Sequence, residues 1–164
     1  MQSDSKTAYL LLGGNLGNRE KYVSDAIKLL EERVGGILQT SSIYETAAWG
    51  NTTLPSFINV AVEIKTVLDP PQLLETVLQI EADLGRIRYE KWGSRAIDID
   101  IILYEDEIVD IVEKLQIPHP EMQNRRFVLL PLTEIAPMVI HPILKQNISQ
   151  LLEDLADNLT VLKR

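Results

Sequence analysis

FINVAVEIKTV, residues 57–67, is the stretch of sequence that decides the fold. Successive side chains of a β-strand point to opposite faces of its sheet, so a strand here has one wholly apolar face. That face would consist of Ile58, Val60, Val62 and Ile64. Phe57 and Asn59 would then lie on the opposite face. The segment therefore predicts a strand whose apolar face packs under helices and whose other face is open.

Helix and strand patterns alternate on both sides of this strand. One amphipathic helix pattern ends near residue 33, and a second begins at Asp69, a predicted N-cap followed by two prolines. Further strand patterns cover residues 7–13, 37–46 and 96–104. The glycine-rich run at 13–17 lacks the lysine of a phosphate-binding loop, so it is interpreted mainly as a turn.

The order of these elements, β-α-β-β-α-β, predicts an α+β fold. It is typical of the ferredoxin-like arrangement, an antiparallel four-stranded sheet with both helices on one face. A hairpin over residues 105–112 and helices near 126–135 and 149–158 would follow. The 164 residues predict a single domain, 1–164.

Composition excludes several classes of function. The chain has no cysteine, which excludes disulfides, zinc–thiolate sites and a cysteine nucleophile. Its formal net charge of −8 argues against nucleic acid as a partner. No apolar run approaches the roughly 20 residues that span a bilayer, and the first residues do not resemble a signal peptide. We therefore expect a cytoplasmic protein with no membrane partner. No heptad pattern is present, so we expect a monomer.

Asp98 and Asp100 lie two residues apart in the strand pattern that ends in IDIDIIL. Because Ile97, Ile99 and Ile101 would form its core face, we expect both carboxylates on the open face, together with Phe57 and Asn59. Carboxylates with Cβ atoms on the order of 6.5 Å apart repel each other unless a cation lies between them. Mg²⁺ suits such a pair because it keeps several waters and takes further ligands from substrate phosphates. Two such ions could clamp a transferring phosphoryl group.

A basic segment, RIRYEKWGSR, precedes the two aspartates at residues 86–95. An isolated pair of aspartates on a strand is usually a solvated face, but the four basic residues favour phosphate binding. They are Arg86, Arg88, Lys91 and Arg95. His119, just before a predicted helix start with two arginines, adds capacity for anions. Trp49 could equally be an aromatic lid over the site or a residue that packs in the fold.

Two other functions are compatible with these residues. A nucleotidyl transferase would also use paired strand carboxylates, but it would release diphosphate. A ferredoxin-like binding or interaction domain without enzymatic activity would have no use for two aspartates beside four basic residues. RNA recognition is disfavoured by the acidic balance of the chain.

Six motifs together resemble one enzyme family over roughly residues 9–155. They are LGGNLGN (12–18), SSIYET (41–46), FINVAV (57–62), GRIR with WGSRAIDIDIIL (85–103), IPHPEMQNRRF (117–127) and LPLTEIAP (130–137). The family is 6-hydroxymethyl-7,8-dihydropterin pyrophosphokinase, of folate biosynthesis. The resemblance implies that the diphosphate of ATP is transferred to the hydroxymethyl group of the pterin and that AMP leaves.

The resemblance also implies the roles of individual residues. Two Mg²⁺ ions would be held by Asp98 and Asp100, and Arg86 and Arg95 would act with them in catalysis. ATP would contact Arg88, Lys91, Trp92, Arg95, the backbone of Ile101, His119 and Arg125. The pterin would contact Thr46, Trp49, Phe57, Asn59 and Phe127, with the two phenylalanine rings stacked on it.

Four positions depart from the family pattern. Lys91 replaces the usual arginine, so it keeps the charge but loses the bidentate fork. Ser94 and Ala47 replace prolines, and Pro120 replaces a common tyrosine. A serine in place of a proline raises the entropy that is lost when a loop closes.

Overall fold

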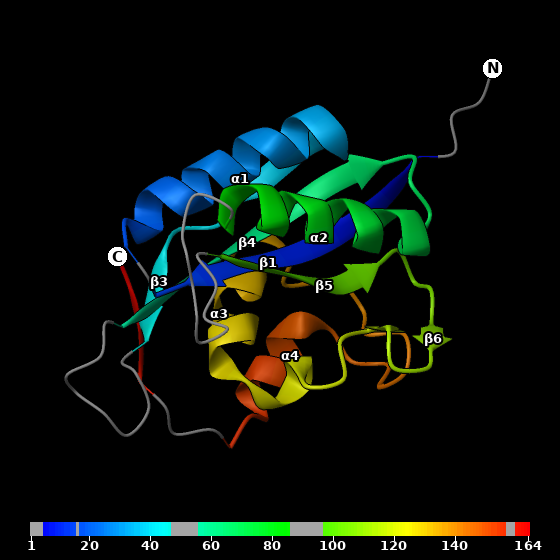
Figure 1. Ribbon diagram of the computed structural model, residues 1–164. Coiled ribbons are helices and arrows are strands. Elements are labelled where there is room, and N and C mark those ends of the chain that lie inside the picture. The colour runs from blue at the N-terminus through cyan, green and yellow to red at the C-terminus, as the bar shows by residue number, and fades with distance from the viewer. Residues whose placement is uncertain (1–4, 16, 47–55, 86–96, 157–159) are drawn as a thin grey trace.

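The computed structural model describes residues 5–15, 17–46, 56–85, 97–156 and 160–164. It is a mixed α and β structure with a main antiparallel sheet (Figure 1). The strands are β1 (Lys6–Gly14), β2 (Gly35–Thr40), β3 (Tyr44–Thr46), β4 (Phe57–Thr66), β5 (Asp98–Tyr104), β6 (Val109–Ile111), β7 (Leu115–Ile117) and β8 (Val161–Lys163). The helices are α1 (Arg19–Arg33), α2 (Pro70–Gly85), α3 (Arg126–Ile135) and α4 (Ile148–Glu153), with a 3-10 turn at Met122–Asn124. Within the described ranges, no helix is both long and apolar enough to cross a membrane.

The main sheet is built around β4. Its order is β5-β1-β4-β3-β8, and β2 also pairs with β4. β1 pairs with β4 along its whole length, whereas β2 and β3 share the other edge of β4. The expected start of α2 is confirmed, because Asp69 and Gln72 exchange side chain to backbone hydrogen bonds of 2.9 Å.

The expected single strand over residues 37–46 is wrong. The structure has two strands, because the chain leaves the regular ladder at Ser41. The Ser41 N–H donates to the carbonyl of Ala61 at 2.8 Å, and the Ser41 hydroxyl accepts from the Ala61 N–H at 2.9 Å. A side chain thus replaces one backbone partner of β4 at this point, which interrupts the strand without leaving Ala61 unpaired.

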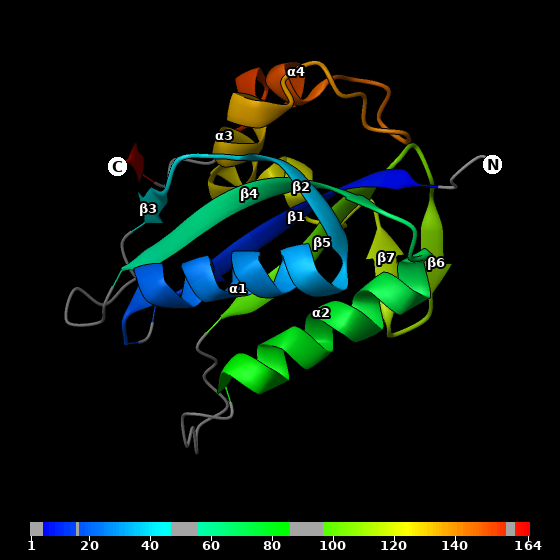
Figure 2. The same cartoon turned by 90° about the horizontal axis from the view of Figure 1, so that it is seen from above.

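Helices cover both faces of the sheet, so the expectation of a helix-free face is also wrong (Figures 1 and 2). α1 and α2 pack on the face that carries the predicted apolar side chains of β4. α3 and α4 pack on part of the other face, around Tyr9, Leu11 and Ala61. Leu11, Ala61 and the ring of Tyr9 are apolar and need cover from water, whereas the Tyr9 hydroxyl donates to Glu63 at 3.1 Å. Phe57 and Asp98 remain exposed at one end of this face.

A β-bulge in β5 changes which face of the sheet its apolar side chains join. Leu10 faces Ile101 and Tyr9 faces Leu103, so Ile102 has no partner in β1. Before the bulge, Ile99 packs under α1 and α2. After it, the alternation is reversed, and Ile102 and Leu103 join the apolar cluster under α3.

The C-terminal third differs from the prediction in three places. The hairpin lies at β6 and β7, with its turn at Glu113 (φ 62°), because residues 105–107 form a turn after β5. α4 ends at Glu153 instead of extending to 158, and its start carries a capping box between Asn147 and Gln150. β8, which was not expected, pairs with β3.

Candidate active site

Two rows of paired residues cross the face of the sheet opposite α1 and α2. Gly13 pairs with Asp98 on one side and with Asn59 on the other. Leu11 likewise lies between Asp100 and Ala61. Both aspartates are exposed, whereas Ile99 between them is buried. The predicted placement of the two carboxylates, away from the core under α1 and α2, is confirmed.

A cavity of about 300 Å³ opens over these rows. It brings together seven of the residues expected at the site with three from β1. The lining residues are Leu11, Gly13, Gly14, Thr46, Phe57, Asn59, Asp98, Asp100, Arg125 and Phe127. We call it the aromatic cavity, because Phe57 from β4 and Phe127 from α3 are both in its walls. Phe57 is 41% exposed, a large fraction for a phenylalanine in a sheet of this size.

Gly13 makes room for the side chain of Asn59. A Cβ atom at Gly13 would lie 2.3 Å from Oδ1 of Asn59 and 3.1 Å from the carbonyl oxygen of Ile58. Only glycine therefore allows the amide of Asn59, which is 8% exposed, to keep its place beside β1. The interpretation of residues 13–17 mainly as a turn was incomplete: Gly17 has the positive φ of a turn, but Gly13 belongs to β1.

Thr46 contributes an unsatisfied polar atom to the aromatic cavity. Its side chain is 4% exposed, and its Oγ1 is buried without a hydrogen-bond partner among the described residues. Buried hydroxyl groups are usually hydrogen-bonded, so this one is an exception.

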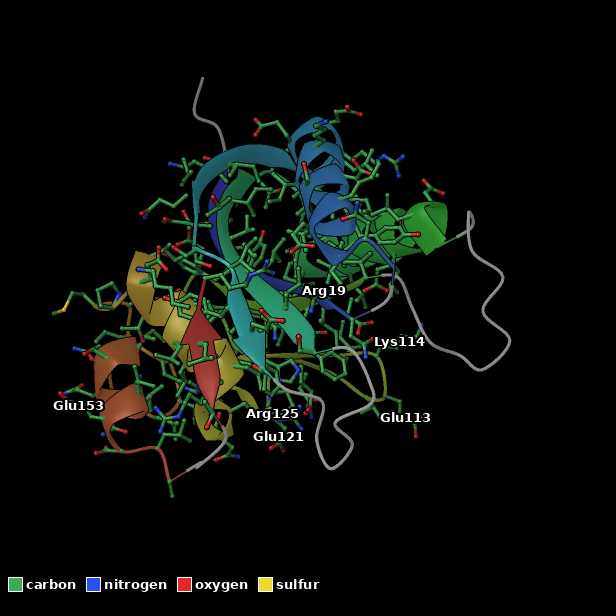
Figure 3. The ribbon with its side chains drawn as sticks, turned by 90° about the vertical axis from the view of Figure 1, so that its left-hand side faces the viewer. Arg19, Glu113, Lys114, Glu121, Arg125 and Glu153 are labelled. Carbon is green, nitrogen blue, oxygen red and sulfur yellow. The ribbon has the colours of Figure 1, made fainter. Side chains whose placement is uncertain are left out.

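β3, which carries Thr46, is also held from the side of α1. Arg19, at the start of α1 (Figure 3), donates to the carbonyl oxygen of Ser56 at 2.7 Å, to its hydroxyl at 2.8 Å and to Glu45 at 3.2 Å. Arg164 approaches the other carboxylate oxygen of Glu45 at 3.5 Å. The strand therefore has charged contacts on the face opposite the cavity.

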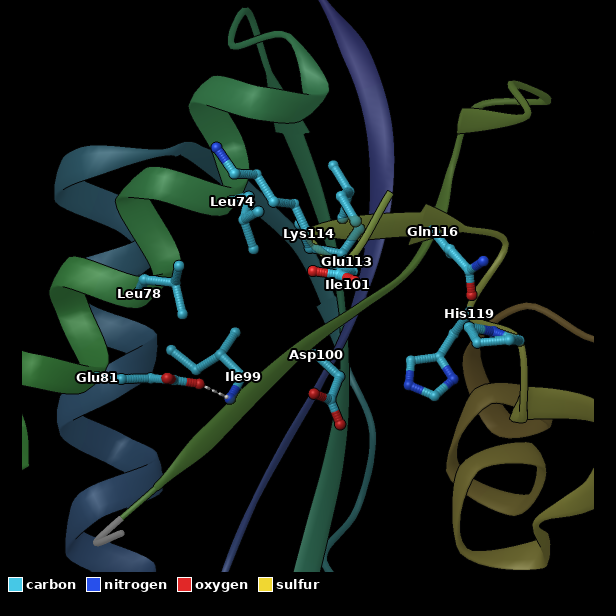
Figure 4. A pocket seen from close by; sticks show the side chains of 12 residues that line it. Leu74, Leu78, Glu81, Ile99, Asp100, Ile101, Glu113, Lys114, Gln116 and His119 are labelled. Carbon is cyan, nitrogen blue, oxygen red and sulfur yellow. Dashed lines mark hydrogen bonds between the residues drawn. The ribbon is translucent and has the colours of Figure 1, made fainter. Parts of the chain in front are cut away.

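A second cavity, of about 450 Å³, runs along the edge of β5 that faces away from β1 (Figure 4). We call it the edge cavity. Its lining residues are Leu74, Leu78, Glu81, Ile99, Asp100, Ile101, Glu113, Lys114, Leu115, Gln116, His119 and Pro120. Asp100 lines both cavities, so the two meet at this carboxylate.

The backbone of β5 is accessible from the edge cavity. The N–H of Ile99 donates outward to the carboxylate of Glu81 at 2.6 Å (Figure 4). Backbone groups two residues apart in a strand point the same way, so those of Ile101 also point to this edge. An edge strand of this kind offers a donor and an acceptor at a fixed spacing.

His119 faces Asp100 across the edge cavity (Figure 4). Burial lowers the pKa of His119, and Arg125 lowers it further, although Asp100 and Glu121 act in the opposite direction. The ring is therefore neutral at pH 7. Its Nδ1 accepts the N–H of Glu121 at 3.1 Å, which assigns the proton to Nε2.

Sequence reasoning missed the seven residues that α2 and the hairpin contribute to the edge cavity. Leu74, Leu78 and Glu81 come from α2, and Glu113, Lys114, Leu115 and Gln116 come from the hairpin. A signal for the first three was present. They follow the i, i+4, i+7 spacing of one helix face, and Leu78 is 49% exposed beside the buried core stripe of α2.

The positions of six expected site residues lie outside the described part of the chain. They are Trp49, Arg86, Arg88, Lys91, Trp92 and Arg95. Among the residues that are described, no group of three or more His, Asp or Glu side chains could hold a metal ion.

The family model for 7,8-dihydro-6-hydroxymethylpterin-pyrophosphokinase (HPPK) matches residues 9–137. The chain belongs to this family. Two curated relatives are named 2-amino-4-hydroxy-6-hydroxymethyldihydropteridine pyrophosphokinase. The one from Aquifex aeolicus is 42% identical over 144 residues, which cover 88% of this chain and 89% of the relative. The one from Bacillus subtilis is 47% identical over 133 residues, which cover 80% and 79%.

Solved structures agree with HPPK membership at the level of the fold. The structure of wild-type HPPK-DHPS from Plasmodium falciparum superposes with a TM-score of 0.76 at 20% identity over 93% of this chain. The chain spans 45% of that longer Plasmodium chain.

Proposed function

We propose that the chain transfers the diphosphate of ATP to the hydroxymethyl group of 6-hydroxymethyl-7,8-dihydropterin and releases AMP, a step of folate biosynthesis. The observation that carries this proposal is the meeting of the two cavities at Asp100. One cavity suits a flat heterocycle with a polar edge, and the other suits a nucleotide. A carboxylate at their junction lies where the transferred group would have to pass.

The aromatic cavity would bind the pterin. Phe57 and Phe127 would stack on its ring system, and Asn59 would hydrogen-bond its amide edge. The unpaired hydroxyl of Thr46 would gain a partner from the same ligand. Trp49 is proposed as a further contact of the pterin.

The edge cavity would bind ATP. The outward-pointing backbone of Ile101 offers a donor and an acceptor to the adenine edge. The neutral imidazole of His119 would donate from Nε2 to the ribose or a phosphate, and Arg125 would bind phosphate from the side of α3. We assign further phosphate contacts to Arg88, Lys91, Trp92 and Arg95.

We propose that Asp98 and Asp100 would hold two Mg²⁺ ions. Asp98 and Asp100 supply hard oxygen ligands from adjacent positions of one exposed face, which leaves coordination sites for water and phosphate. Bound Mg²⁺ would neutralise phosphate charge and lower the pKa of the attacking hydroxyl.

Catalysis would depend on positioning and charge. The pterin hydroxyl oxygen attacks the β-phosphorus of ATP and loses its proton, while the bond from this phosphorus to the α–β bridging oxygen breaks and AMP leaves. We assign Arg86 and Arg95 to the charge that develops on the diphosphate. The stacked rings hold the hydroxymethyl group toward Asp100, which makes the reaction effectively unimolecular.

The finer features of the fold belong to the same proposal. We interpret β1, α1, β2 with β3, β4, α2 and β5 as a ferredoxin-like core with its helices α1 and α2 on one face. We also propose that the chain is a single domain that works as a monomer in the cytoplasm.

The product of the reaction tests the proposed function. The protein is mixed with ATP, Mg²⁺ and 6-hydroxymethyl-7,8-dihydropterin, and the nucleotide product is identified by chromatography. AMP that forms only when the pterin is present is the expected result. Release of diphosphate would favour a nucleotidyl transferase, release of ADP a simple kinase, and no nucleotide product a binding domain.

Gly13→Ala is expected to raise the KM for the pterin by about tenfold, because the new Cβ displaces the amide of Asn59 and costs one or two hydrogen bonds to the ligand. Gly36→Ala is the matched control, since a Cβ at Gly36 has nothing within 4 Å. Steady-state kinetics for both substrates make the comparison. An unchanged pterin KM for Gly13→Ala would show that the amide of Asn59 does not hydrogen-bond the pterin.

A further inference from the structure

One carboxylate joins α3 to the segment that leads into β3. Oε1 of Glu134 accepts the Tyr44 hydroxyl at 2.7 Å, and both carboxylate oxygens accept the Ser42 N–H at 3.1 Å. The Ser42 hydroxyl also donates to Oε2 at 3.1 Å. Three donors from two neighbouring residues therefore converge on a single side chain of α3.

The contacted strand carries one wall of the aromatic cavity. Tyr44 and Thr46 are two residues apart in β3, so their side chains lie on the same face of the sheet. Tyr44 is bound to Glu134, and Thr46 lines the cavity. Tyr44 also pairs with Asn59 of β4, whose side chain lines the cavity too.

The contacted helix carries another part of the lining of the aromatic cavity, Phe127. Phe127 lies in the first turn of α3, and Glu134 lies seven residues later in its last turn. At 1.5 Å per residue the two are about 10 Å apart along one helix, with Pro131 between them. The carbonyl of Ile135 is held as well, by the side chain of Gln39 at 3.1 Å. A change in the contacts of Glu134 would therefore tilt the helix that presents Phe127.

The charge states of the two partners suit this contact. Burial by itself would raise the pKa of Glu134, but hydrogen bonds from Tyr44 and Ser42 hold it below its usual value. Burial and the bond to Glu134 raise the pKa of Tyr44 to about 12. At neutral pH the phenol thus donates to an ionised carboxylate, and hydrogen bonds of this kind are stronger than neutral ones.

We propose that Glu134 is a positioning residue for the pterin, because it fixes α3 to β3 and so keeps Phe127 and Thr46 at a constant separation across the aromatic cavity. This inference rests on the proposed function. It assigns to Glu134 no contact with either substrate, since the residue lines neither cavity.

Glu134→Ala tests the inference through a split between the two substrates. We expect the KM for the pterin to rise about tenfold, equivalent to about 1.4 kcal/mol, while the KM for ATP rises several-fold less. Of the described residues assigned to ATP only Arg125 lies at α3, and the edge cavity itself is lined by α2, β5, the hairpin and residues 119–120, none of which the substitution changes. Glu134→Gln, which keeps one acceptor oxygen, should recover part of the pterin affinity.

Tyr44→Phe completes a double-mutant cycle. It removes only the hydroxyl that Glu134 accepts, so it should also raise the pterin KM. The double variant should be no worse than Glu134→Ala alone, because the two changes remove one shared contact. Val23→Ala, a core substitution in α1 on the other face of the sheet, controls for a general loss of stability.

The outcomes are distinguishable. A wild-type protein that forms no AMP would overturn the proposed function and this inference with it. An active wild type whose Glu134→Ala variant keeps its pterin KM would overturn the inference alone. An equal rise in both KM values, or the same rise in Val23→Ala, would assign Glu134 to general stability and would also overturn it.

Discussion

Asp100→Ala is expected to lower kcat for AMP formation by about 1000-fold, equivalent to about 4 kcal/mol of transition-state stabilisation. The reason is the position of this carboxylate at the junction of the two cavities, where it would hold metal against the transferred phosphate. Asp98→Ala should have a similar effect, because it removes the second ligand of the pair. Both activities are measured at saturating ATP and Mg²⁺.

The fold of these variants should survive. Asp98 and Asp100 are exposed, so neither change opens a cavity in the core. Far-UV circular dichroism and thermal melts should match the wild type closely. Asp106→Ala removes an exposed carboxylate from the turn after β5 and serves as the control. Turnover of Asp100→Ala within tenfold of the wild type would contradict the metal assignment.

Phe57→Ala is expected to raise the KM for the pterin about 30-fold. Stacking of a base on an aromatic side chain contributes roughly 1–3 kcal/mol, and 2 kcal/mol corresponds to about 30-fold. Because Phe57 is 41% exposed, its removal should cost little stability. The KM for ATP should stay within twofold, since Phe57 does not line the edge cavity.

Two further variants separate stacking from general apolar contact. Phe57→Trp keeps a π-face and should retain most of the pterin affinity, whereas Phe57→Leu should lose most of it. Leu38→Ala, an exposed apolar side chain of β2 outside both cavities, should leave both KM values unchanged. If Phe57→Leu bound the pterin as well as the wild type, stacking would not explain the exposed ring.

Strand alternation predicted the arrangement around β4 and the first part of β5. It placed Ile58 and Ile99 under α1 and α2, and Asp98, Asp100 and Asn59 on the other face, as the structure has them. A period of two is a local property of the backbone, so a single sequence contains it.

The other features depend on contacts between distant segments. The cover of Leu11 and Ala61 by α3 could not be read from the strands alone, because apolar residues on a second face do not specify which helix packs there. β8 is a three-residue strand without alternation of its own, so only its pairing with β3 defines it.

In the candidate site, too, local patterns predicted some residues, whereas others depend on contacts between distant segments. The two aspartates were found from their spacing, and His119 from its neighbours. The partnership of Phe57 with Phe127 came only from the resemblance to a family, because no local pattern joins residues 70 positions apart. The role of Gly13 beside Asn59 required the register of β1 against β4.

The carboxylate that lines both cavities has a thermodynamic consequence. Two sites that share a charged group are thermodynamically linked. The factor by which a bound nucleotide changes the dissociation constant of the heterocycle therefore equals the factor by which the bound heterocycle changes the dissociation constant of the nucleotide. Calorimetric titrations in the two orders should therefore close to the same total free energy, whichever molecule enters first.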